Sequence, residues 1–269
     1  TADLPEGMYK AVEVEAPDKY DISDSTYYFG IGTSREGKEG IKATWAEGIG
    51  GTNNDYIDSV AECSDGGYIV GGHFNSSIDL ENGVSLTNKG DSDGMVIKYS
   101  ENGEIEWAEG IGGTKYDEIT SVAECSDGGY IVGGYFSSSI DLGTGISLTY
   151  KGNGDGMIIK YNARGEVEWA KQLGGTYADA VVSVKQTRDG GYIVGGYFKS
   201  SSIDLGTGIS LTNKGSYDGM IIKYNAAREV EWAEGIGGTE NDEINSVSET
   251  SDGGYIVGGY FKSSSIDLG

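Results

Sequence analysis

Four aspartates at equivalent positions are the residues of this sequence best suited to binding a metal ion. Each stands three residues after the Thr of a Gly-Gly-Thr segment: Asp55, Asp117, Asp179 and Asp242. Carboxylates gathered around one axis would offer the oxygen ligands that a hard cation such as Ca2+ prefers. Alternatively, each carboxylate accepts backbone N–H bonds and holds its own loop in shape. We favour the loop role, because a connection rebuilt four times needs a fixed hydrogen-bonding group. The sequence therefore requires no cofactor, and Ca2+ is the candidate ion.

Catalytic chemistry finds little support in the residue types present. The single histidine, His73, stands where other copies of its segment have Tyr135, Tyr197 and Tyr260. This favours a tolerated substitution over a catalytic base. No Ser/His/Asp, Cys/His, phosphate-loop or zinc pattern occurs. A glycosidase-type carboxylate pair stays open as a distant alternative in so acidic a chain. We expect a protein that is not an enzyme.

Tyrosine is the side chain most suited to contacting a ligand surface. The chain has 19 tyrosines, and most fall at fixed positions of a repeated pattern, where packing is their expected role. Five tyrosines occur in variable segments and are the candidate ligand contacts: Tyr56, Tyr116, Tyr150, Tyr177 and Tyr217.

The elements that must position these residues are copies of one block. By subtraction, the tryptophans Trp45, Trp107, Trp169 and Trp232 are separated by 62, 62 and 63 residues. A fixed period of this size indicates an array of identical supersecondary units.

Each block predicts four short strands, which in the first copy are 59–63, 68–74, 95–99 and 104–109. Asp65-Gly66 is typical of a hairpin turn. Gly71-Gly72 puts bare backbone inside a strand, which indicates close approach of a neighbouring sheet. Lys98 and Glu106 lie across from each other as an expected solvated ion pair, and the later copies repeat this pairing.

The predicted fold is all-β. Four-stranded antiparallel units with short hairpins are typical of the blades of a β-propeller. The copies make three complete blades, with half a blade at each end. Pairing 25–47 with 246–261 would form a composite fourth blade and close the ring, which removes exposed strand edges. Residues 25–269 are thus one predicted domain, and 1–24 are a predicted arm or extra strand.

A family resemblance supports this architecture. The runs Glu-Trp-Ala-Glu-Gly-Ile-Gly-Gly-Thr, Asp-Gly-Gly-Tyr-Ile-Val-Gly-Gly and Asp-Gly-Met-Ile-Ile-Lys-Tyr resemble the β-propeller repeats of secreted and surface-anchored bacterial proteins. These are often called seven-bladed propeller repeats. The resemblance covers 25–269 and implies an extracellular scaffold or adhesion module without a common catalytic residue. The chain departs from the family in its smaller number of copies.

Composition excludes several function classes. With 19 basic and 43 acidic residues, the formal charge is -24. This charge opposes binding to nucleic acid or to an anionic membrane surface. No apolar run approaches the ~20 residues needed to span a bilayer, so we expect no membrane insertion. Cys63 and Cys125 occupy a position that holds Thr in later copies, which favours two buried thiols over a disulfide.

These observations predict an extracellular or cell-surface binding scaffold, with a protein or a glycan as its ligand. The alternative is a self-assembling subunit of a filament or sheath, built through strand exchange by residues 1–24 or by the half-blades. A carbohydrate-active enzyme is the distant alternative.

Overall fold

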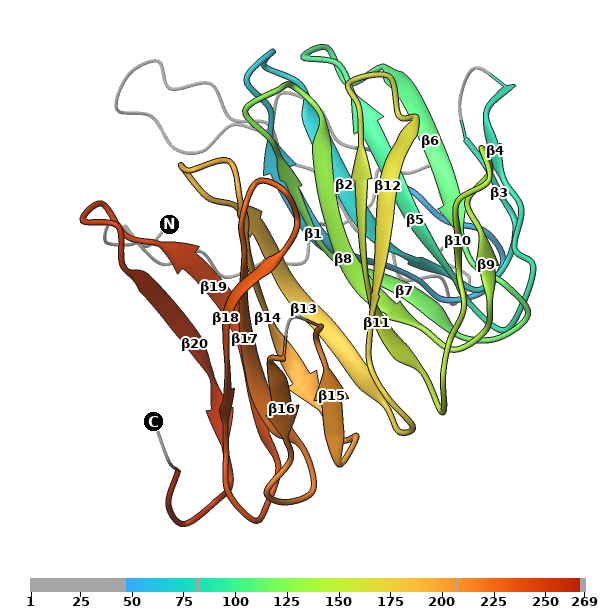
Figure 1. Ribbon diagram of the computed structural model, residues 1–269. Coiled ribbons are helices and arrows are strands. Elements are labelled where there is room, and N and C mark those ends of the chain that lie inside the picture. Colours follow the sequence, from blue (N-terminus) through green and yellow to red (C-terminus); the bar gives the residue numbers. More distant parts are fainter. Residues whose placement is uncertain (1–46, 81–82, 207, 267–269) are drawn as a thin grey trace, which may run out of the picture.

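The computed structural model describes residues 47–80, 83–206 and 208–266. The predicted arm at 1–24, and all but residue 47 of the N-terminal half of the predicted closing blade, lie outside the described residues. Every helix or strand in the element order of the described part is a β-strand, which confirms the all-β class. The described residues contain three four-stranded sheets and a C-terminal hairpin, which Figure 1 colours from blue to red along the chain.

Each full unit is one antiparallel sheet. The first has the order β1-β2-β5-β6 and consists of β1 (Asp55–Glu62), β2 (Tyr68–Phe74), β5 (Asp93–Tyr99) and β6 (Ile105–Ile111). The second consists of β7 (Asp117–Glu124), β8 (Tyr130–Phe136), β11 (Asp155–Tyr161) and β12 (Val167–Leu173). The third consists of β13 (Asp179–Gln186), β14 (Tyr192–Phe198), β17 (Asp218–Tyr224) and β18 (Val230–Ile236).

The fourth unit has two described strands, β19 (Asp242–Glu249) and β20 (Tyr255–Phe261), which pair only with each other. Within the described ranges no sheet closes on itself. The structure therefore shows repeated four-stranded antiparallel units, whereas the four-blade count and the ring closure stay predictions. None of the described residues belongs to a helix long and apolar enough to cross a membrane.

The first strand of each unit begins four residues earlier than predicted. In β1, the pairing with β2 shifts register between Ile57 and Ser59, which marks a β-bulge. A bulge breaks the alternation of inward and outward side chains, so periodicity alone placed the start after it. The second strand has the predicted bounds.

A small hairpin stands in each long loop between the second and third strands, where none was predicted. The hairpins are β3 (Ile78–Asp79) with β4 (Ser85–Leu86), β9 (Ile140–Asp141) with β10 (Ser147–Leu148), and β15 (Ser202–Asp204) with β16 (Ser210–Thr212). Ile78 and Leu86 are buried in one cluster with Phe74. The hairpin is thus held by side-chain burial and not by a long hydrogen-bonded ladder.

Close packing between units confirms the predicted role for the first glycine of the pair, whereas a Cβ on Gly72 would meet the backbone of Tyr56 in its own sheet. A Cβ atom added to Gly71 would lie 2.5 Å from Cγ1 of Val122, on the first strand of the next unit. Val122 and Ile119 join Ile69 and Val96 in one buried cluster between the first two units. The core therefore lies between consecutive sheets, and the same arrangement recurs along the array.

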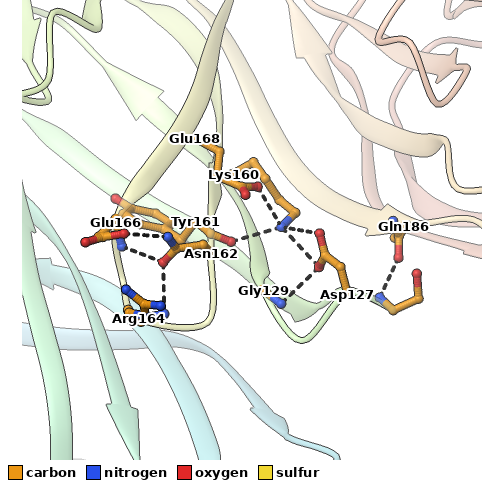
Figure 2. Close-up of polar contacts among 10 residues, drawn as sticks. Asp127, Gly129, Lys160, Tyr161, Asn162, Arg164, Glu166, Glu168 and Gln186 are labelled. Atoms are coloured by element: carbon orange, nitrogen blue, oxygen red, sulfur yellow. Dashed lines mark hydrogen bonds and ion pairs between the residues drawn. The ribbon is translucent and has the colours of Figure 1, made fainter.

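The Lys–Glu pairs form as predicted, but the expectation that they are solvated is wrong. Nζ of Lys160 lies 3.2 Å from Glu168, 2.9 Å from Asp127 and 3.0 Å from the carbonyl oxygen of Tyr161 (Figure 2). The Lys160 side chain is only 2 % exposed. Burial alone would lower the pKa of Lys160, but the hydrogen bond that Lys160 donates to Asp127, together with the other negative charges, outweighs burial and raises the pKa. The equivalent Lys98 and Lys223 make the same contacts, so each of the three full units has a buried ammonium group joining its third strand to its first turn.

Both cysteines are free and buried, as predicted. Burial raises the pKa of the Cys63 thiol to about 11 and that of the Cys125 thiol to about 12. The two thiols are therefore protonated at neutral pH and act as small core side chains.

Candidate functional site

The four aspartates singled out from the sequence each serve their own loop. Asp55 accepts the N–H of Gly51 at 2.7 Å on Oδ2 and the N–H of Asn75 at 3.0 Å on Oδ1. The other three accept the equivalent N–H groups, as Asp117 does from Gly113 and Ser137. All four carboxylates are buried at the start of the first strand of their unit; we call these four strands, β1, β7, β13 and β19, the inner strands.

Each unit boundary also brings two carboxylates near each other. Asp93, which begins β5, is buried, and its Oδ1 has no hydrogen-bond partner. The pKa of Asp117 is raised to about 6, because burial and the negative charge of Asp93 together outweigh the backbone N–H bonds that lower it. The same electrostatic pairing joins Asp155 with Asp179. These are groups of two carboxylates. No group of three or more His, Cys, Asp or Glu residues suited to a metal ion occurs in the part of the chain that the structure describes.

The second feature is a line of aromatic rings that crosses several units. His73 stacks on Tyr56 with ring centroids 4.6 Å apart and lies 5.6 Å from Tyr116. Tyr116 in turn lies 6.2 Å from Tyr135. Further along the array, the rings of Tyr197 and Tyr217 meet edge to face at 5.4 Å. We call Tyr56, His73, Tyr116, Tyr135, Tyr197, Tyr217 and Tyr260 the aromatic band.

Hairpin register explains why these residues lie at one end of the inner strands. Opposite the second residue of each inner strand stands a ring from the neighbouring strand, as in the pairs Tyr56 with His73 and Glu118 with Tyr135. The fourth unit pairs Glu243 with Tyr260 in the same way. Successive units therefore place their rings at equivalent positions along the inner strands.

Carboxylates are interleaved with the aromatic band. The hydroxyl of Tyr116 donates to Glu118 at 2.7 Å, and that of Tyr260 donates to Glu243 at 3.1 Å. Burial raises the pKa of Tyr197, and the negative charges of Glu118 and Glu243 raise it further. Asp58 contacts Nδ1 of His73 at 2.9 Å. The band thus combines aromatic rings, of which Tyr116 and Tyr260 are exposed, with hydrogen-bonding acids.

His73 occupies a packing position. It is 8 % exposed, and its ring is held between Tyr56, Tyr116 and the carboxylate of Asp58. Tyr135, Tyr197 and Tyr260 occupy the same place in the other units, so His73 belongs structurally with them.

Sequence reasoning identified part of the band. Three of the five candidate tyrosines, Tyr56, Tyr116 and Tyr217, lie in it, whereas Tyr150 instead faces Nζ of Lys115 at 5.6 Å. Tyr177 is 48 % exposed and makes none of the band's ring contacts. Tyr135, Tyr197 and Tyr260 recur at one fixed position of the repeat. Sequence reasoning assigned tyrosines at such positions to packing and therefore did not identify these three as members of the band. Their position opposite variable residues across the hairpin is the sequence signal that would have found them.

A groove of about 540 Å3 runs between the inner strands of all four units. Its lining includes Ser59 and Glu62 of β1, Glu124 of β7, Lys185 of β13 and Asn245 of β19. Because the lining is mixed in charge, the groove shows no single chemical preference.

Comparison with known proteins identifies no family, since no family model matches the chain. The chain is 24% identical over 166 residues to the regulatory protein FlaEY of Caulobacter vibrioides, which covers 59% of this chain and 17% of that protein. It is 25% identical over 152 residues to an uncharacterized WD repeat-containing protein, L264, of Acanthamoeba polyphaga mimivirus, covering 52% of this chain and 11% of that protein. This chain spans less than a fifth of either curated relative.

A solved structure of a protein of unknown function from Bacteroides caccae has a TM-score of 0.38 and 13% identity, with 84% of this chain and 80% of that chain covered. The repeated four-stranded units, together with the WD-repeat relative, fit a propeller-like repeat fold.

Proposed function

We propose that this protein is a non-enzymatic binding module whose aromatic band holds a neutral glycan chain. The observation that supports the proposal is the run of rings, two of which are exposed, interleaved with carboxylates across successive units. Tyr116 and Tyr260, which belong to different units, are 39% and 38% exposed.

The chemistry of the band suits a sugar polymer. Aromatic rings present flat apolar faces with a polar edge, which match the apolar face and hydroxyl rim of a pyranose ring. Tyr hydroxyls and the carboxylates of Glu118 and Glu243 exchange hydrogen bonds with hydroxyl groups. Since the rings are repeated along the array, an extended chain makes more contacts than a single sugar.

The charge of the protein narrows the ligand class. A formal charge of -24 repels sulfated or uronic acid polymers, so the glycan is uncharged. The same charge attracts a basic protein segment, which would use cation–π contacts with the rings. Neutral glycan binding is the function we propose, and basic-peptide binding is the competing outcome of the test.

The proposed location is the bacterial cell surface or the extracellular space, where such a module serves adhesion. This part of the proposal rests on the resemblance of the repeats to those of secreted and surface-anchored proteins. The rigid strands of the array keep the rings in place, which lowers the entropy lost on binding.

Affinity electrophoresis through gels containing soluble neutral polysaccharides tests the proposal, with polylysine as the competing ligand in a separate binding assay. We expect at least one neutral polysaccharide to retard the protein. Tyr116→Ala should lower the affinity about tenfold, which corresponds to about 1.4 kcal/mol. Tyr116→Phe should lower the affinity by a smaller factor. Tyr150→Ala, outside the band, is the matched control. Binding of polylysine alone, or equal effects of Tyr116→Ala and Tyr150→Ala, would overturn the proposal.

A further inference from the structure

Consecutive units meet through the same three contacts each time. In the first contact, an apolar side chain of the following unit fills the space over a glycine of the preceding unit. A Cβ atom on Gly71, Gly133 or Gly195 would lie 2.5, 2.6 or 2.5 Å from a valine methyl of the next inner strand. The glycine therefore acts as a socket for the next unit.

The second contact is a hydrogen bond between inner strands. The N–H of Val122 donates to Oγ of Ser59 at 3.1 Å. The N–H groups of Val184 and Val247 donate in the same way to Ser121 at 3.1 Å and Ser183 at 3.3 Å.

In the third contact, a side chain at the end of an inner strand accepts from the hairpin turn of the preceding unit. Glu124 accepts the N–H of Ser64 at 2.7 Å, and Gln186 accepts the N–H of Ser126 at 2.7 Å. Glu249 accepts the N–H of Arg188 at 2.8 Å. Because Gln replaces Glu at one boundary, a hydrogen-bond acceptor is needed here and a charge is not.

The two ends of the array each carry one half of this contact. At one end, Val60 of β1 is 65% exposed, whereas its counterpart Val122 is 6% exposed. At the other end, no atom of the described residues lies within 4 Å of the position of a Cβ on Gly258. Ile256 beside it is 62% exposed, whereas the equivalent Ile193 is fully buried. The β1 face and the β19–β20 face are thus complementary, and within the described residues Val60 does not pack over Gly258.

We propose that β1 of one copy of this chain packs against the β19–β20 face of a second copy. Val60 then covers Gly258, the N–H of Val60 donates to Oγ of Ser246, and Glu62 accepts the N–H of Ser251. This interface continues the contact that joins units within the chain. It is heterologous, so it builds a closed ring of copies or an open filament. The inference concerns assembly, and it brings Tyr56 of β1 and Tyr260 of β20, two members of the aromatic band, to the interface between copies.

Because the chain is highly acidic, its assembly should depend on the salt concentration. Two copies that each carry a formal charge of -24 repel each other, and salt screens this repulsion. We therefore expect association to strengthen from low salt to 0.5 M NaCl, a concentration at which the Debye length is on the order of 4 Å.

Disulfide cross-linking between separately purified single-cysteine variants tests the interface. Cys63 and Cys125 are first replaced by Thr, the residue at the same place in later units. One protein then carries Val60→Cys and the other Ser246→Cys. Ser59→Cys with Val122→Cys in one chain is the positive control, since these residues already contact each other. Val60→Cys mixed with Ser147→Cys, on the outer hairpin, is the negative control.

We expect a covalent dimer after mild oxidation of the Val60→Cys and Ser246→Cys mixture, and none from either protein alone. A double variant that cross-links only within one chain would show that the array closes on itself and would overturn the proposal. Absence of the covalent dimer while the positive control forms its disulfide would overturn it as well.

Light scattering gives a second readout that does not depend on cysteines. We expect the unmodified protein to exceed its monomer mass at high salt, and Val60→Glu to return it to monomer because the substituted carboxylate cannot fit over Gly258. The Val60 side chain is largely exposed, so this variant should fold. A wild-type protein that stays monomeric at every concentration and salt level would contradict the inference.

Discussion

Nζ of Lys160 lies 2.9 Å from the carboxylate of Asp127, although the lysine is 2% exposed and the aspartate 55% exposed. The pair joins β11 to the turn between β7 and β8, two elements that are distant in sequence. The repeat thus keeps a lysine buried by pairing it with a carboxylate, as fully buried charged side chains require.

Removing the acids around Lys160 should destabilise the fold more than removing the lysine. Asp127→Ala with Glu168→Ala leaves a buried ammonium group without carboxylate partners, and we expect a loss of about 3 kcal/mol in the free energy of unfolding. Lys160→Met leaves acids that are half exposed and reach water, so its cost should be about 1 kcal/mol. Urea denaturation measures both. Exposed Lys185→Met is the control, and a double variant as stable as this control would refute the buried-cation account.

The paired carboxylates predict a pH dependence. The pKa of Asp117 in the folded protein, about 6, is above its value in the unfolded chain. A raised pKa means that the folded state binds the proton more tightly, so this contribution to stability is complete below about pH 4 and is lost as the pH rises through 6. Asp93→Asn removes the neighbouring charge. We expect it to raise stability at pH 7 by about 1 kcal/mol and to change little at pH 4.

Thermal unfolding of Asp93→Asn at the two pH values checks this prediction. Exposed Asp91→Asn, two residues away, controls for the loss of one negative charge from an acidic chain. Equal stabilisation by the two variants would mean that overall charge, and not the buried pair, is responsible.

The glycine sockets predict losses of stability of very different size for two equivalent substitutions. Gly133→Ala places a methyl group against Val181 on the next unit, and overpacking of this kind should cost about 1–3 kcal/mol. Gly258→Ala meets open space in one chain and should cost far less, although it should weaken association between copies. Denaturation of dilute protein at low salt measures the stability of the monomer. Similar losses of stability for the two variants would contradict the socket model.

Calcium should leave thermal stability unchanged. The carboxylates of Asp55, Asp117, Asp179 and Asp242 already accept N–H groups of their own loops, so they offer few free lone pairs to an ion. A ligand that binds only the folded state raises its stability. A higher unfolding midpoint with millimolar calcium than with chelator, abolished by Asp117→Asn, would reveal a cation site after all.

Prediction from the sequence succeeded where the interacting residues lie close together along the chain. The hairpins follow from alternation and turn residues within about twenty positions, so β2 was predicted residue for residue. The bulge after Ile57 hid the start of β1, because it breaks the periodicity on which the prediction rests. The hairpin of β3 and β4 was missed since two-residue strands carry no periodicity of their own.

Residue types and the repeat by themselves determined the all-β class, the four-stranded unit, the glycine contacts and the two buried thiols. Only the tertiary structure decided that Lys160 is buried, that tyrosines from different units form one band, and that the two ends expose complementary faces. The reason is physical: a periodic pattern specifies local pairing through backbone hydrogen bonds. Side-chain burial and contacts between units depend on how each sheet packs against the next, and no single repeat contains that information.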